Sequence, residues 1–153
     1  MRLLLICVGK ARQPFADDIA HYERLLARHA RLETVELAEA GAAAERAPQA
    51  LASEGDAILK RIPGGAYVCA LDRAGKHLSS EELAAQLEER RMARADLCFV
   101  VGGPRGLDPR VLERSRLRLA FGRVTLPHQL ARVILLEQLF RAHKILAGEP
   151  YHY

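Results

Sequence analysis

The chain has no tryptophan, only three cysteines and no apolar run long enough to cross a membrane. Its first apolar run, Leu3 to Val8, is too short for a signal peptide. Cys7, Cys69 and Cys98 are odd in number, lie far apart and stand inside apolar stretches, which predicts buried core thiols. Because no Cys-x-x-Cys or His-x-x-x-His pair occurs, neither a disulfide framework nor a metal site is supported. We expect a cytoplasmic protein without a membrane segment.

Lysine is also scarce, since only four of the 23 basic residues are Lys and the rest are Arg. The net charge of +4 favours an anionic partner, and guanidinium groups suit phosphate oxygens. A biased codon composition would give the same excess of Arg, so charge alone does not decide between these readings. The length of 153 residues fits one domain, 1–153, which must supply both recognition and any chemistry.

Apolar runs alternate with helical patterns along the whole chain. Strands are expected at Arg2–Val8, Leu32–Leu37, Tyr67–Asp72, Leu97–Val101 and Leu117–Phe121. Helices are expected with Pro14 in a first turn, then at Pro48–Ile62, after the capping-box pattern Ser79-x-x-Glu82, near Pro109–Arg114 and at about Gln129–Ala147. This order predicts an α/β fold with a mainly parallel sheet and helices on both faces.

The last predicted helix carries more apolar residues than one face needs. Four consecutive apolar positions, Val133 to Leu136, are followed by Leu139, Phe140, Ile145 and Leu146. A helix packed only on its own sheet needs a single stripe, so the excess indicates a second partner. The simplest partner is the same helix of a twofold-related subunit, which predicts a homodimer. Deep burial within one chain is the alternative.

Two groups of residues point to chemistry. The loop Gly102 to Gly106 follows a predicted buried strand, where parallel sheets place their ligands, although a tight turn explains its glycines equally well. It matches neither a Walker loop nor a dinucleotide fingerprint. At the start of the last helix His128 precedes Arg132 by one turn, although a helix-capping His and a surface Arg explain the pair equally simply. The spacing of Glu137 and Arg141 predicts an ion pair.

The C-terminal Tyr151 and His152 stand where chain ends usually fray. An aromatic ring beside an imidazole can stack on an unpaired base and form a hydrogen bond to it. No partner is evident for the remaining histidines, which we interpret as surface or packing residues: His21, His29, His77 and His143.

In order and spacing, a set of motifs resembles the RlmH-type family: Val8-Gly-Lys10, Leu71-Asp72, Gly102-Gly103-x-x-Gly106, Thr125-Leu-Pro-His128, Arg132-Val133, Glu137-Gln138, Arg141-Ala142 and Gly148-x-Pro-Tyr-His152. That family comprises SPOUT-class methyltransferases that modify N3 of a pseudouridine in the 23S rRNA of the large ribosomal subunit. The resemblance covers essentially the whole chain. Its specificity comes from the C-terminal motifs, whereas the glycine loop alone would not identify the family.

The resemblance implies a C-terminal trefoil knot, S-adenosylmethionine bound in that knot, and a homodimer with a shared active site. Carried over by position, the cofactor site comprises Leu71, Gly103, Phe121, Gly122, Arg123, Val124, Thr125 and Leu126. A side chain added at Gly103 would then occupy space that the adenosine needs. The residues facing the RNA and the transferred methyl group would be His128, Arg132, Arg141, Tyr151 and His152. Phe140 and Tyr153 depart from the residues common in the family.

The implied reaction is an attack of the pseudouridine N3 on the methyl group of the donor. Arg132, with Arg141 as a second candidate, would stabilise the developing anion, and His152 or else His128 would accept the imide proton. The implied partner is 23S rRNA, presented by the assembled ribosome, with no role for DNA or a metal. The competing functions are a related SPOUT enzyme acting on tRNA or another rRNA nucleotide, and a noncatalytic ribosome-associated factor.

Overall fold

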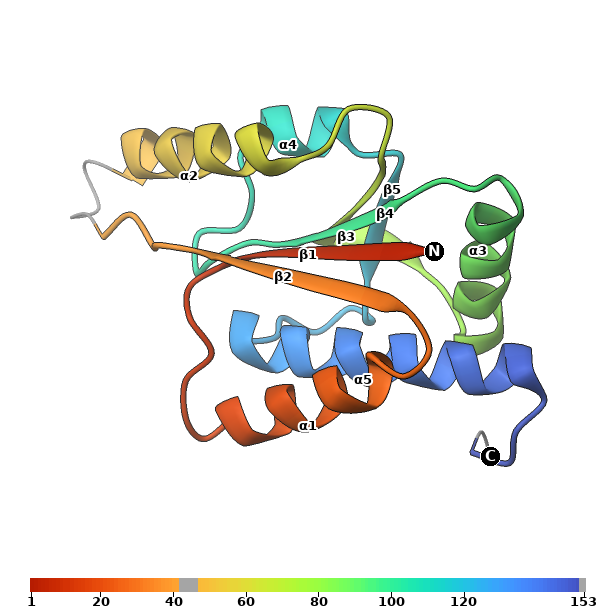
Figure 1. Cartoon of the computed structure of the whole chain (residues 1–153). Helices are drawn as coiled ribbons and strands as arrows, with labels where there is room; N and C mark the ends of the chain where they lie inside the picture. The colour runs from red at the N-terminus through yellow and green to blue at the C-terminus, as the bar shows by residue number, and fades with distance from the viewer. Residues whose placement is uncertain (42–46, 152–153) are drawn as a thin grey trace.

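A sheet of five parallel strands forms the centre of the protein (Figure 1). The computed structural model describes residues 1–41 and 47–151. In the order β2-β1-β4-β3-β5 across the sheet, the strands are Arg31–Leu37, Arg2–Val8, Leu97–Val101, Tyr67–His77 and Leu117–Ala120. The predicted α/β fold with a parallel sheet is confirmed.

Helices cover both faces of the sheet, as predicted (Figure 1). One face carries α1 (Ala16–Leu26), α3 (Ser80–Met92) and α5 (His128–Ala147), and the other carries α2 (Ala47–Arg61) and α4 (Pro109–Arg114). Successive side chains of β1 enter the two cores in turn, because strand side chains alternate between faces. Among the described helices, none combines the length and the apolar character needed to cross a membrane.

Strand β3 is longer than predicted. The apolar run ends at Asp72, but the strand continues because residues 72–75 bulge out and Lys76 then pairs with the same residue of β5 as Leu71 does. Gly75 permits the close passage of the two chains, since a Cβ atom there would lie 2.6 Å from a main-chain carbon of β5. The prediction from the sequence covers only the first part of β3, Tyr67–Asp72.

Helix α1 also begins later than predicted. Phe15 is its N-cap, so Pro14 lies before the helix and not in its first turn. The bounds of β2, β5, α2 and α5 differ from the prediction by one residue at one or both ends. These differences leave the order and the type of every predicted element unchanged.

The three cysteines are core residues, as predicted. Cys7, Cys69 and Cys98 are at most 1% exposed and none forms a disulfide. Burial raises the pKa of each thiol to about 12, because a thiolate would have to lose its water shell. They contribute packing and are neutral at physiological pH.

Helix α5 packs under the sheet beside α1 and α3 (Figure 1). Leu135, Leu136 and Leu139 are completely or almost completely buried within the chain. Leu130 and Ile134, one turn apart on the helix, are only half-buried. Packing within one chain therefore explains part of the apolar excess of α5, and the homodimer stays a prediction.

The capping box of α3 gives a test of local stability. Ser79 Oγ accepts a hydrogen bond from the backbone N–H of Glu82 at 3.0 Å, and Glu82 Oε2 accepts one from the N–H of Ser79 at 2.7 Å. We expect Ser79→Ala to lower the free energy of unfolding by about 1 kcal/mol. Urea denaturation followed by circular dichroism measures it. Ser53→Ala, on an exposed position inside α2, is the control and should not destabilise. Equal midpoints for Ser79→Ala and wild type would contradict the capping role.

Candidate functional site

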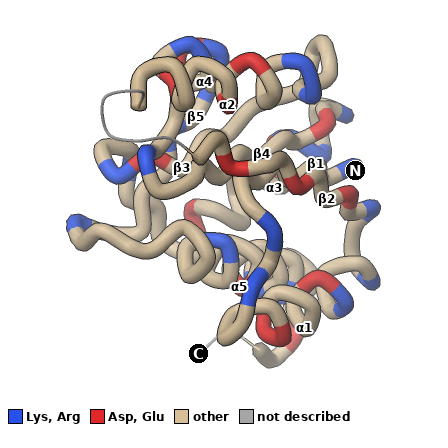
Figure 2. The backbone as a smooth tube through the Cα atoms, turned by 90° about the vertical axis from the view of Figure 1, so that its left-hand side faces the viewer, with Lys and Arg blue, Asp and Glu red and all other residues tan. Residues whose placement is uncertain are grey.

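A cleft of about 430 Å³ opens at the carboxyl ends of β3, β4 and β5. Figure 2 views the molecule from this edge of the sheet. The walls come from residues 71–73 of β3, from 101–107 at and after the end of β4, and from 119–122 and 124–126 at and after the end of β5, together with Leu112 and the start of α5. Because all strands are parallel, these segments emerge on the same side, which is where such sheets bind ligands. The volume lies within the range of roughly 300–1,000 Å³ typical of cofactor sites.

The residues that the family resemblance assigned to the cofactor gather in this cleft. All of them line it except Arg123, namely Leu71, Gly103, Phe121, Gly122, Val124, Thr125 and Leu126. Sequence reasoning had not assigned the neighbouring Asp72 and Arg73 to the site, although both line the cleft. Their position directly after an apolar strand run was the signal that could have identified them.

The glycine loop is both a tight turn and a wall of the cleft, so the two readings of its sequence are compatible. The N–H of Gly106 donates to the carbonyl of Gly103 at 3.0 Å and closes the turn. A Cβ atom at Gly102 would lie 2.5 Å from the carbonyl oxygen of Gly106. Gly106 and Gly122, with φ of +80° and +101°, have open space where a side chain would start.

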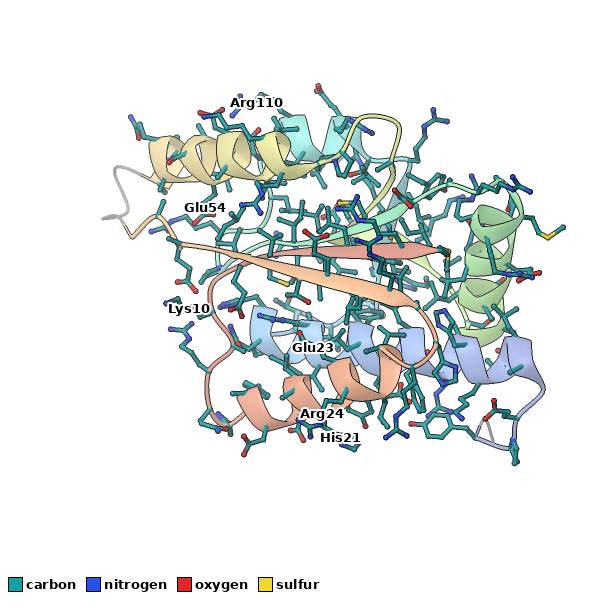
Figure 3. The ribbon with its side chains drawn as sticks, viewed as in Figure 1. Lys10, His21, Glu23, Arg24, Glu54 and Arg110 are labelled. Carbon is teal, nitrogen blue, oxygen red and sulfur yellow. The ribbon has the colours of Figure 1, made fainter. Side chains whose placement is uncertain are left out.

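A side chain at Gly103 would point away from the cleft, which differs from the expectation that it would occupy the space of the adenosine. A Cβ atom there would not enter the cleft, because it would lie 3.0 Å from Val8 Cγ1 and 3.9 Å from Glu54 Oε1. Figure 3 shows Glu54 between α2 and the sheet, so this side of the loop faces the protein interior. A substitution at Gly103 therefore strains the core beneath the loop before it affects the ligand space.

Arg132 is buried and does not line the cleft. Its Nη1 donates to Glu36 Oε2 at 2.8 Å, and its Nη2 donates to Glu23 Oε1 at 3.4 Å. Figure 3 shows Glu23 where α1 faces α5. The backbone N–H of Ala11 also donates to Glu36, at 2.7 Å. This network joins α5 to β2, to α1 and to the segment after β1, and a contact of Arg132 with substrate stays a prediction.

His128 lines the cleft at the first turn of α5. Its Nε2 lies 3.1 Å from Glu39 Oε1, and Arg12 Nη2 donates to the same oxygen at 3.2 Å. The next residue, Gln129, is buried and donates to the carbonyl of Lys10 at 2.9 Å while accepting from the N–H of Arg12 at 3.2 Å. The start of α5 is thus fixed to the segment that follows β1. Sequence reasoning missed Glu39, although it stands just after a predicted strand.

The other predicted site residues form a cluster near the C-terminus. The predicted ion pair is confirmed, with Arg141 Nη2 at 2.7 Å from Glu137 Oε1. Tyr151 donates its hydroxyl to the same oxygen at 3.1 Å, and its ring packs edge-on against Phe140 with centroids 4.9 Å apart. Burial and this hydrogen bond raise the pKa of Tyr151, so the phenol remains protonated at neutral pH. His152 lies outside the described residues.

The two groups lie at opposite ends of one helix. His128 begins α5 and Arg141 comes near its end, so about 20 Å of helix separates them at 1.5 Å per residue. The left-handed Gly148, with φ of +69°, then turns the chain back so that Tyr151 packs beside Arg141. Within one chain the cleft and the tail cluster are therefore separate.

The fold and the cleft define an α/β protein with a ligand site at the carboxyl edge of a parallel sheet. The family described as "Predicted SPOUT methyltransferase" matches residues 1–152. The chain belongs to this SPOUT methyltransferase family, and the resemblance found in its motifs is confirmed.

Similar proteins match over nearly the full length. A protein of Rubrobacter xylanophilus named "Ribosomal RNA large subunit methyltransferase H" is 46% identical over 155 residues, which cover 99% of this chain and 98% of that one. A protein of the same name from Carboxydothermus hydrogenoformans is 42% identical over 158 residues, with 99% of each covered. The solved structure of a probable methylase family protein from Haemophilus influenzae Rd KW20 has a TM-score of 0.56 at 13% identity, covers 99% of this chain and 70% of that one, and shows a shared fold.

The position of Gly103 predicts a loss of stability. Gly103→Ala places a methyl group against the buried Val8, and we expect it to lower the free energy of unfolding by about 1–3 kcal/mol. Thermal denaturation measures the change. Gly64→Ala is the control, because its added Cβ would meet nothing within 4 Å and its backbone does not require glycine. If both variants melt like the wild type, a side chain at Gly103 does not press on the core beneath the loop.

The Glu36–Arg132 pair predicts a pH dependence. Burial acts to raise the pKa of Glu36, but the hydrogen bonds from Arg132 and Ala11 outweigh it and hold that pKa below its ordinary value. Such a group stabilises the fold above its unfolded pKa of about 4.3, and the contribution disappears as the pH falls further. Glu36→Gln should therefore cost about 1 kcal/mol at neutral pH, a value discounted for partial solvent exposure.

Urea denaturation of Glu36→Gln and wild type at several pH values checks this expectation. The difference between them should shrink in acid, where the wild-type carboxyl is protonated as well. Glu33→Gln, on the same strand as Glu36, breaks a surface pair with Arg2 of β1. It is the control and should change stability by less than about 1 kcal/mol at any pH. A gap for Glu36→Gln that does not vary with pH would show that the ion pair is not its cause.

Proposed function

We propose that the chain is an S-adenosylmethionine-dependent methyltransferase that modifies N3 of a pseudouridine in 23S rRNA, as a single SPOUT domain spanning 1–153 in the cytoplasm. Membership of the family and the names of its full-length relatives support rRNA methylation. The observation that carries the proposal for this chain is the cleft, where all but one of the residues assigned to the cofactor meet from three separate loops. The trefoil knot implied by the family belongs to the same proposal.

The cleft suits S-adenosylmethionine. Leu71, Phe121 and Leu126 provide apolar walls for an adenine ring, and the bare backbone at Gly106 and Gly122 allows close approach of the ligand. The lining carries charges of both signs, from the carboxylate of Asp72 and the guanidinium groups of Arg73 and Arg105, and S-adenosylmethionine likewise carries both positive and negative groups. When bound, the cofactor supplies an activated methyl group on a sulfonium.

The chain's own residues must align the two reactants and remove one imide proton. Of the five residues predicted to face substrate, His128 lines the cleft and can accept a proton there. Arg132 acts by fixing the start of α5, because its guanidinium is held by Glu36 and Glu23. Arg141 lies too far along the helix to reach the cleft of the same chain, and Tyr151 packs beside it.

That separation supports a homodimer in which the tail of one protomer completes the cleft of its partner. Apolar residues just before α5 and on its first turns are exposed or half-buried, and a second copy could cover them. They are Val124, which is 67% exposed, together with Leu130 and Ile134 on the first turns of α5. Two copies related by a twofold axis would complete two equivalent sites at once.

Methyl transfer from labelled S-adenosylmethionine tests the function. The acceptors are whole ribosomes, isolated large subunits, free 23S rRNA and tRNA, and the labelled nucleotide is identified by mass spectrometry. We expect label at N3 of a pseudouridine in 23S rRNA, most rapidly with ribosomes. Transfer to tRNA instead would indicate a related SPOUT enzyme. Stoichiometric ribosome binding without S-adenosylmethionine affinity would indicate a noncatalytic factor.

Deleting residues 151–153 tests the tail. We expect dimer mass and cofactor affinity to be unchanged while turnover on ribosomes falls roughly a hundredfold, because the reacting base loses a wall or a proton acceptor. Sedimentation, calorimetry and single-turnover methyl transfer measure the three quantities. Removal of Tyr153 alone is the matched control and should leave turnover near the wild-type value. Wild-type turnover by the longer deletion would exclude a role of the tail in catalysis.

A further inference from the structure

Three segments that are distant in sequence meet beside the cleft. They are the end of β1 at Gly9, the segment after β2 at Glu39, and the first residue of α5, His128. The Nε2 atom of His128 lies 3.1 Å from Glu39 Oε1, and the His128 side chain is only 16% exposed. Arg12 binds the same carboxylate oxygen at 3.2 Å and gives it a second anchor. The imidazole is therefore held by a carboxylate that is itself held in place.

Gly9 leaves the space that this pair occupies. A Cβ atom at this position would lie 2.8 Å from Glu39 Oε1 and 3.5 Å from His128 Nε2. The backbone at Gly9 has φ of +97°, which other residues adopt only with strain. The N–H of Gly9 also donates to the carbonyl of Leu37 at 2.6 Å, which ties it to the strand that leads to Glu39. The backbone at Gly9 and the Glu39–His128 pair thus pack directly against each other.

The contact selects one tautomer of the imidazole. A carboxylate can only accept, so Nε2 carries the hydrogen that it donates to Glu39. The Nδ1 atom then has a free lone pair, and it forms no hydrogen bond to any residue that the structure describes. A carboxylate beside the opposite nitrogen also stabilises the imidazolium formed when Nδ1 takes up a proton.

We propose that His128 is the proton acceptor of the methyl transfer and that Glu39 is the residue that positions it. This inference rests on the proposed function. The N3–H bond of the pseudouridine breaks and its proton passes to Nδ1 of His128. The electron pair left on N3 forms the bond to the methyl carbon, and the carbon–sulfur bond of the donor breaks with its pair moving to sulfur. His128 later returns the proton to water.

The first test compares Glu39→Gln with Glu33→Gln. The amide keeps the size of the side chain, but it has no charge and can present its NH₂ group to Nε2, which would move the hydrogen to Nδ1. We expect the turnover number of Glu39→Gln on ribosomes to fall by roughly 10- to 100-fold. The KM for ribosomes and the Kd for S-adenosylmethionine should change less than about twofold, because positioning acts on the transition state. Glu33→Gln, on β2 and paired with Arg2 at the surface, should match the wild type.

The second test separates positioning from a structural role. His128→Ala should lose at least as much turnover as Glu39→Gln, and added imidazole should restore part of it. In the His128→Ala background, Glu39→Gln should have little further effect, because the two residues act as one unit. Thermal midpoints of all variants show whether each is folded under the assay conditions.

Two results would overturn the inference. One is a Glu39→Gln enzyme with wild-type turnover. The other is a loss of the same size when Glu39→Gln is added to His128→Ala, which would make Glu39 independent of the imidazole. Methyl transfer by the wild type alongside either result overturns this inference alone. Absence of transfer by the wild type to every RNA acceptor overturns the proposed function, and the inference with it.

Discussion

The arrangement of the cleft depends on the burial of one guanidinium. A charge taken out of water is tolerated only when opposite charges and hydrogen bonds replace its hydration, and Glu36 and Glu23 provide both for Arg132. Because these carboxylates come from β2 and α1, the pairing fixes the first turns of α5 against two other elements. His128 follows from this constraint, since its backbone belongs to the turn that Arg132 holds. The cleft is therefore framed by rigid elements even though its walls are loops.

Helix α5 contributes residues to two separate parts of the protein. Its first turn contributes His128 to a cleft rich in backbone and apolar surface, and its last turns carry a polar cluster built from Glu137, Arg141 and Tyr151. The middle of the helix is occupied by Leu135, Leu136 and Leu139, which belong to the core. The proposed site uses both ends of this rigid helix, and two chains can complete such a site more readily than one.

The sequence predicted the fold well and the site in part, for a physical reason. Strands and helices follow from local periodicity, and the residues that gather in the cleft were expected there from the short motifs of the family resemblance. The bulge in β3, the burial of Arg132 and the inward direction at Gly103 depend on contacts across the sheet. Arg132 stands on the helix like any surface Arg, and only the arrival of Glu36 from another element makes its burial possible. Glu39 was missed because no local pattern relates it to His128.

The three buried thiols give the core a chemical property of its own. Alkylating reagents attack the thiolate, and with a pKa of about 12 and almost no exposure the sulfurs of Cys7, Cys69 and Cys98 are unreactive in the closed fold. They lie on β1, β3 and β4, the three inner strands of the sheet. Alkylation of these thiols therefore requires the centre of the sheet to open. The rate of labelling by such a reagent reports how often that happens, and no residue has to be changed to introduce a reactive group.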